Sequence, residues 1–146
     1  MFAVIDCGTT MTRVYIVDAK GNITASGIRE IGVRDTSITG SRDVLRIGIT
    51  DLFFQVLLEN HIPDCDVNFV ISSGMITSEV GLLEVPHLHV PVGIQQLSEN
   101  VVEIKDPEIL PVGRPVYFIR GVCNAPEGTR LGGLLQTDFM RGEEVQ

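Results

Sequence analysis

The sequence predicts an α/β domain with a mixed sheet flanked by helices. Three short apolar runs rich in strand-forming residues follow one another over residues 2–30, and an amphipathic pattern occupies about 42–60. Further short β-rich runs come after that pattern. Strands, a helix and more strands in one chain are typical of an α/β sheet with helices on its faces. A length of 146 residues suits a single domain.

The first thirty residues are expected to form three consecutive antiparallel strands, at 2–7, 12–18 and 23–30. The second connection carries Ala-Lys-Gly-Asn, which are ordinary turn residues. The first connection differs, because Gly8-Thr9-Thr10 follows directly on an acidic residue at a strand end. Short turns between apolar runs predict hairpins.

One helix is predicted with a clear apolar face, over about 42–60. The residues that share this face are spaced four, three and four apart: Leu45, Ile49, Leu52 and Val56. Residues 31–42 are interpreted as a loop in which Thr39 or Ser41 caps this helix, and Pro63 prevents a longer one.

The sequence patterns of the remaining segments are less regular. We expect a strand at 67–72, a short helix at 76–83, an extended loop at 84–93, a brief helix at 94–100, and strands at 101–104 and 115–120. Residues 124–137 have no clear period. The predicted order is therefore β-β-β-α-β-α-β.

Charge and cysteine content narrow the function classes. The net charge of −8 argues against non-specific nucleic-acid binding, which depends on Lys and Arg. The chain lacks an apolar run of about 20 residues, so we expect no membrane span, and its first residues do not read as a secretory leader. The three cysteines are far apart, which predicts free, buried thiols in a reducing cytoplasm rather than disulfides or a zinc site.

The sharpest chemical signal is Asp6-Cys7-Gly8-Thr9-Thr10, followed by Arg13. Gly8 lets the backbone approach a ligand closely, and the amides and hydroxyls of this turn suit phosphate oxygens. Asp6 suits Mg²⁺, which takes few carboxylates and keeps water, while Arg13 adds positive charge for a transferred phosphoryl group. The alternative is an ordinary turn whose Asp and Thr side chains bond to their own backbone.

The stretch IDCGTTMTRVYIVDAKGNI resembles the first phosphate loop of the actin/hexokinase/Hsp70-like ATPase superfamily, which implies a ribonuclease H-like, actin-like lobe. Three later segments look like signatures of the 2-dehydro-3-deoxygalactonokinase family: Ser73-Gly74-Met75-Ile76, Val85-Pro86-His87-Leu88 with Pro91, and Met140 to Gln146. The resemblance spans the whole chain, and its Met-Arg-Gly-Glu-Glu ending is the most specific part.

This resemblance implies an ATP-dependent, Mg²⁺-dependent kinase that transfers the γ-phosphoryl group to a hydroxyl of a 2-keto-3-deoxy sugar acid. The residues that it assigns to the phosphates and metal are Asp6, Gly8, Thr9, Thr10 and Arg13. It places Ser73, Gly74 and Met75 near the sugar acid. We expect Arg141 to pair with the substrate carboxylate and Glu143 or Glu144 to orient or deprotonate the attacking hydroxyl. The alternative for these last three is a solvated chain end.

The sequence also departs from the family pattern. Cys7 stands where the family usually has an aromatic residue, and it is expected to act as a small buried hydrophobe. His87 stands where Tyr is usual. A second glycine-rich phosphate loop does not follow, so residues 1–146 are interpreted as a single N-terminal lobe whose C-terminal lobe is absent, and the chain alone as an incomplete kinase. The alternative is a non-catalytic orphan lobe that serves as a binding or oligomerisation module, or as one half of a split kinase. The expected partners are a small-molecule sugar acid and either a second copy or the missing lobe.

Overall fold

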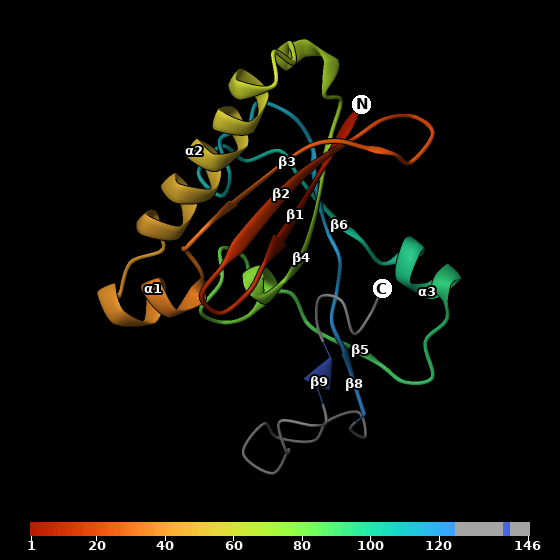
Figure 1. Cartoon of the computed structure of the whole chain (residues 1–146). Helices are drawn as coiled ribbons and strands as arrows, with labels where there is room; N and C mark the ends of the chain where they lie inside the picture. Colours follow the sequence, from red (N-terminus) through yellow and green to blue (C-terminus); the bar gives the residue numbers. More distant parts are fainter. Residues whose placement is uncertain (125–138, 141–146) are drawn as a thin grey trace.

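The computed structural model describes residues 1–124 and 139–140. Its centre is a six-stranded mixed sheet in the order β3-β2-β1-β4-β7-β6 (Figure 1). The strands are β1 (Phe2–Cys7), β2 (Thr12–Val17), β3 (Ile23–Arg29), β4 (Val70–Gly74), β6 (Val102–Ile104) and β7 (Val116–Phe118). The predicted α/β class with a mixed sheet flanked by helices is confirmed.

The first three strands form the predicted antiparallel meander, with β2 paired to both β1 and β3. The carboxylate of Asp18 fixes the second turn, because its Oδ1 accepts hydrogen bonds from the backbone N–H groups of Lys20 and Asn22 at 2.8 and 2.9 Å. Gly21 completes this turn with φ +86°, a conformation that favours glycine.

Strands β1, β4 and β7 run parallel to one another, and β6 closes the edge antiparallel to β7. The carboxyl ends of β1 and β4 therefore meet at the same edge of the sheet. Strand β4 begins at Val70, later than the sequence pattern predicts, because a 3-10 turn, η1 (Asp64–Asp66), is followed by residues 67–69, which lie outside any strand.

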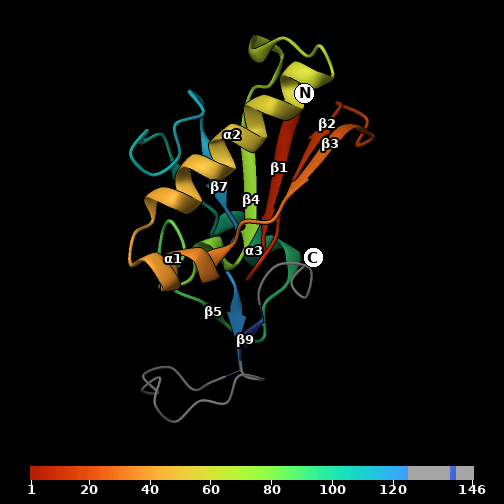
Figure 2. The ribbon, with the colours of Figure 1, turned by 60° about the vertical axis from the view of Figure 1, so that its left-hand side comes forward.

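Helix α2 (Asp43–Glu59) covers one face of the sheet, as Figure 2 shows. The four residues of its predicted apolar face are at most 2% exposed: Leu45, Ile49, Leu52 and Val56. Gly27 of β3 permits close contact, since a Cβ there would lie 2.4 Å from Val56 Cγ2. Burial of this stripe against Ala3, Ile5 and Val14 forms the core.

Three predicted segments differ in the structure. The expected loop at 31–42 contains a short helix, α1 (Val33–Thr39), which buries Val33 and Thr36. The expected helix at 76–83 is only a 3-10 turn, η2 (Met75–Thr77), because the chain folds back and the N–H groups of Leu83 and Val85 donate to the carbonyls of Ile76 and Thr77. The expected loop at 84–93 contains β5 (Leu88–His89), whereas the brief helix is confirmed as α3 (Ile94–Glu99).

A second, smaller sheet has the order β5-β8-β9, in which β8 (Val122–Cys123) lies between β5 and β9 (Phe139–Met140). Strand β5 is parallel to β8, and β9 is antiparallel to it. The three cysteines are free; Cys7 and Cys123 are buried as expected, but Cys65 is exposed, because it lies in η1 at the surface. In residues 1–124 and 139–140, no helix is long and apolar enough to cross a bilayer.

Candidate functional site

Asp6 lies near the carboxyl end of β1, on the sheet face opposite α2. Its neighbours Ile5 and Cys7 point into the core and are fully buried, whereas the Asp6 side chain is 21% exposed. Asp6 stands opposite Arg13 on β2 and Ser73 on β4. A single hydrogen bond of 3.3 Å joins Arg13 Nη1 to Asp6 Oδ2, and the Arg13 side chain is 45% exposed. Both charged groups are therefore accessible from solvent.

The turn after β1 presents Thr9 at the surface and half-buries Gly8 and Thr10. It closes through a hydrogen bond of 2.8 Å from Gly8 N to Met11 O. Just beyond the turn, the hydroxyl of Thr12 is buried and donates to the carbonyl of Ile31 at 2.8 Å. This bond ties the start of β2 to the segment that leads into α1.

The first turn of α1 packs directly against the phosphate-loop candidate. The N–H of Val33 donates to Gly8 O at 3.3 Å, and the N–H of Arg34 donates to Thr9 O at 3.0 Å. The sequence interpretation missed this contact, since it assigned residues 31–42 to a loop. The available signal was Gly32 with Asp35 three residues later, a spacing typical of a helix start.

Gly74 ends β4 beside β1 and Asp6. Its backbone has φ +89° and ψ −150°, a region that is essentially restricted to glycine. An added Cβ would lie 2.5 Å from Cys7 O and 3.1 Å from Asp6 Oδ1. Glycine is therefore required here both by conformation and by contact, and it lets the two strand ends meet.

The two neighbours of Gly74 have different surroundings. Ser73 is 2% exposed and shares the Asp6 face of the sheet. Met75 packs, partly buried, against the hydrophobic core, which is the ordinary environment of an apolar side chain. Arg141, Glu143 and Glu144 lie outside the described residues, so their assignments stay predictions.

Cys7 is fully buried behind the turn. Burial raises the pKa of its thiol to about 11, with a smaller rise from the charge of Asp6, while a hydrogen bond with Thr12 lowers it. Cys7 is therefore a neutral thiol across the physiological range. It behaves as the small buried hydrophobe that the sequence predicts.

The structure thus brings seven predicted site residues to one edge of the sheet: Asp6, Gly8, Thr9, Thr10, Arg13, Ser73 and Gly74. Together they offer an accessible carboxylate, an accessible guanidinium, two Thr hydroxyls and a turn with backbone amides. These are the donor types that hold phosphate oxygens, and a carboxylate that reaches solvent suits a hydrated Mg²⁺ ion. The chemistry of this set fits a magnesium-bound polyphosphate.

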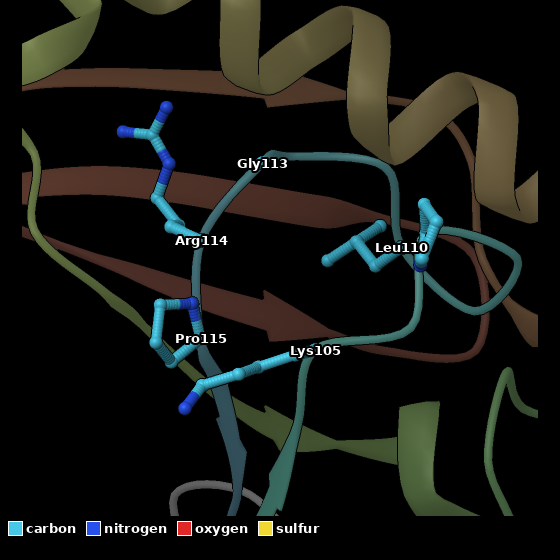
Figure 3. Close-up of a pocket in the computed structure, with 6 residues that line it drawn as sticks. Lys105, Leu110, Gly113, Arg114 and Pro115 are labelled. Atoms are coloured by element: carbon cyan, nitrogen blue, oxygen red, sulfur yellow. The ribbon is translucent and has the colours of Figure 1, made fainter.

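A cavity of about 320 Å³ lies at the other end of the sheet, in the connection between β6 and β7 (Figure 3). Its lining includes Lys105 and Arg114, whose side chains extend in different directions. Arg114 is already engaged, because it donates to the carbonyls of Val112, Asp64 and Val67 and to the Asp64 carboxylate. Lys105 pairs with Glu103 at 2.8 Å.

Comparisons with known proteins identify the family and the fold of the chain. The chain matches the family model of 2-keto-3-deoxy-galactonokinase over residues 6–146. Its structure is similar to that of a Sinorhizobium meliloti protein provisionally assigned as a 2-dehydro-3-deoxygalactonokinase, with a TM-score of 0.68 and 22% identity over 99% of this chain and 40% of that one. A reductive activator for a corrinoid, iron-sulfur protein is similar at a TM-score of 0.56 and 18% identity, over 82% of this chain and 22% of that one.

These likenesses show the fold, consistent with an actin-like lobe, and this chain spans less than half the length of either solved relative. No curated protein matches it. The family match, in contrast, extends from Asp6 of the site to the last residue. The chain therefore belongs to the 2-keto-3-deoxy-galactonokinase family.

Proposed function

We propose that this chain is the N-terminal, phosphate-binding lobe of an ATP-dependent kinase that phosphorylates a 2-keto-3-deoxy sugar acid of the galactonate type. The observation that carries the proposal is the meeting of Asp6, Arg13 and the Gly8–Thr10 turn at one sheet edge, in a chain of this family. The sugar acid is taken from the family description and from the predicted signatures.

The chain's own residues would act mainly by positioning and by charge, which is what phosphoryl transfer requires. Thr9 and Thr10 would donate hydrogen bonds to phosphate oxygens, and Asp6 would hold the magnesium ion that neutralises phosphate charge. Arg13 would turn from Asp6 to the transferred group. An exposed ion pair contributes about 0–1 kcal/mol, so this exchange loses little.

Ser73 and Gly74 lie next to Asp6, which suits a sugar-acid site beside the phosphates. Within the proposal, Arg141 would bind the substrate carboxylate, and Glu143 or Glu144 would accept the proton of the attacking hydroxyl. The hydroxyl oxygen would bond to the γ-phosphorus as the bond from that phosphorus to the β–γ bridging oxygen breaks and ADP leaves. A second lobe, in the part of the relatives that this chain does not span, would supply the rest of the nucleotide site.

The test is Asp6→Asn in a full-length kinase that carries this lobe, with 2-dehydro-3-deoxygalactonate as substrate and ADP release as the readout. Asn keeps the shape but removes the charge that would bind the metal, so we expect kcat to fall by about 10²–10³ and the Mg²⁺ requirement to rise. Thr9→Ala is expected to have a smaller effect, because backbone amides remain. Unchanged turnover and Mg²⁺ dependence in Asp6→Asn, with an unchanged thermal melt, would contradict the proposal.

A second candidate is a pairing module, in which the lobe binds another chain without catalysis or as half of a split kinase. A row of partly exposed aromatic rings favours it: Phe2 stacks on Phe69 at 5.2 Å, and Phe69 meets Tyr117 edge-on at 5.8 Å. These rings lie on the sheet face opposite α2, where Ile28 is 56% exposed. Light scattering at high concentration tests this candidate, which predicts a dimer or larger species and is contradicted by a monomer.

A further inference from the structure

We propose that the first turn of α1 is a brace that aims the backbone amides of Thr9 and Thr10 at the bound phosphates, and that Gly32 is a positioning residue in this brace. The inference rests on the proposed function, since it concerns how the same site holds its anion. It assigns a role to a helix and a glycine that the sequence motifs do not include.

The direction of the two amides follows from the bonds on the adjacent carbonyls. Gly8 O accepts from Val33 N at 3.3 Å, and Thr9 O accepts from Arg34 N at 3.0 Å. Both peptide units in the turn are trans. In a planar trans peptide, the carbonyl of one residue and the N–H of the next point in opposite directions. The N–H groups of Thr9 and Thr10 therefore both point away from α1.

Two successive N–H groups that point the same way form a concave, anion-binding arrangement of backbone. In the described part of the chain, neither N–H donates to another backbone group. Thr9 is exposed, and Arg13 and Asp6 flank the turn. The first amides of α1 itself are occupied by the loop carbonyls, so the helix orients the anion site rather than forming it.

Gly32 makes the close approach of α1 possible. Its φ of −163° and ψ of −174° are extended backbone that any residue adopts, so conformation does not require glycine. Close contact does require glycine here, because an added Cβ would lie 2.3 Å from Thr9 O and 2.6 Å from Thr10 N. Both are backbone atoms of the turn, and no side-chain rotation relieves such a clash. Gly32→Ala therefore has to move the turn or the helix.

The experiment compares Gly32→Ala with Gly93→Ala in the 146-residue chain. Gly93 is a matched control, because it also precedes a short helix in extended backbone and donates its N–H to the side chain three residues on, Gln96, at 3.0 Å. A Cβ on Gly93 would meet only the end of that flexible side chain, at 3.0 Å. The measurements are affinity for magnesium pyrophosphate and magnesium ATP, amide chemical shifts of Thr9 and Thr10, and a thermal melt.

We expect Gly32→Ala to weaken both ligands about tenfold, the equivalent of one charge-assisted hydrogen bond, and to shift the Thr9 and Thr10 amide signals before any ligand is added. Gly93→Ala should stay within about twofold of the unaltered chain by the same arithmetic. A folded Gly32→Ala chain with unchanged affinity and amide signals would overturn the inference. An equal loss of affinity in Gly32→Ala and Gly93→Ala would also overturn the inference, since it would reflect general destabilisation of the chain.

If Gly32→Ala does not fold, Asp35→Ala tests the same brace without an added Cβ. The Asp35 carboxylate accepts from Gly32 N at 2.9 Å and holds the first turn of α1, and Gln96→Ala removes the corresponding bond from α3. We expect Asp35→Ala to lower the affinity for magnesium pyrophosphate and magnesium ATP by about two- to fivefold. Gln96→Ala should leave these affinities unchanged. Equal affinities in the two variants would refute the brace. Absence of binding by the unaltered chain would instead overturn the proposed function, and this inference with it.

Discussion

The two ends of the central sheet each pair an arginine with an aspartate, but the two pairs have opposite surroundings. At the carboxyl end of β1, Arg13 is 45% exposed and makes one hydrogen bond of 3.3 Å to Asp6. At the other end, the Arg114 side chain is 7% exposed, and it donates to three carbonyls and the Asp64 carboxylate. Its guanidinium also lies 5.1 Å from the centre of the Phe53 ring.

The difference shows that two arginines of the same fold can differ in burial and in the number of bonds, so that one is held by the protein and the other stays accessible to a ligand. Arg114 has its donors engaged by the protein, and it joins Phe53 of α2 to η1 and to Val67, the residue that follows η1. Arg13 keeps most of its donors for solvent or a ligand. A cavity lies beside Arg114, whereas the residues that we propose to bind phosphate lie at the opposite end of the sheet.

Replacing each of the two arginines by alanine is expected to change the free energy of unfolding by very different amounts, and the loss of Arg114 should have the largest effect. Arg114→Ala takes the Arg114 donors from the carbonyls of Val67 and Val112 and removes the partner of the Asp64 carboxylate, so we expect the free energy of unfolding to fall by about 2–4 kcal/mol. Arg13→Ala removes an exposed pair and should change it by about 1 kcal/mol or less. Urea unfolding of both variants measures these changes in the free energy of unfolding. Similar losses in the two variants would refute the distinction between the arginines.

Gly74→Ala is expected to have the next largest effect. The forbidden backbone conformation alone amounts to about 1–3 kcal/mol, and the 2.5-Å approach to Cys7 O adds to it. Gly21→Ala is the matched control, because Gly21 has nearly the same φ, +86° against +89°, but nothing within 4 Å of its added Cβ. Thermal melts should place Gly74→Ala clearly below Gly21→Ala; melts that coincide would show that the contact at the strand ends is unimportant.

The smallest expected effect concerns pH and Cys7. The folded chain holds this thiol proton more tightly than the unfolded chain, since burial raises the pKa from 9.0 to about 11. Stability should therefore be fully present below pH 9 and decline as pH rises from about 9 to about 11. In Cys7→Ala this part of the decline should disappear. Iodoacetamide at pH 8 should label exposed Cys65 but spare Cys7, and rapid labelling of native Cys7 would contradict its assignment as a buried neutral thiol.

The sequence predicted best where a single periodic pattern decides the structure. The meander over 2–30 and the apolar stripe at Leu45, Ile49, Leu52 and Val56 are local patterns, and the structure confirms both. The start of α1 was not predictable in the same way, because its stability depends on packing against Gly8 and Thr9, far away in the sequence. The reason for Gly74 likewise lies in a contact with β1 that only the parallel pairing creates.

For the candidate site, the DCGTT motif and Arg13 predicted the residues that meet at the edge of β1. The sequence did not predict the burial of Ser73 or the packing of Met75 on the core. Both follow from the way the chain folds back on itself after β4. The sequence also did not predict which of the two arginines would have its donors engaged, because three of the four acceptors of Arg114 belong to Asp64 and Val67, about 50 residues away in the sequence.

We propose that polyphosphate binds at the carboxyl end of β1 and not at the cavity beside Arg114. A titration of the isotope-labelled 146-residue chain with magnesium ATP, followed by amide chemical shifts, tests it most directly. We predict that the signals of Gly8, Thr9, Thr10 and Arg13 move with ligand concentration while those of Lys105 and Gly113 stay in place, and that Asp6→Asn reduces the movement. Shifts confined to the Lys105–Arg114 end, or an identical response in Asp6→Asn, would contradict the account.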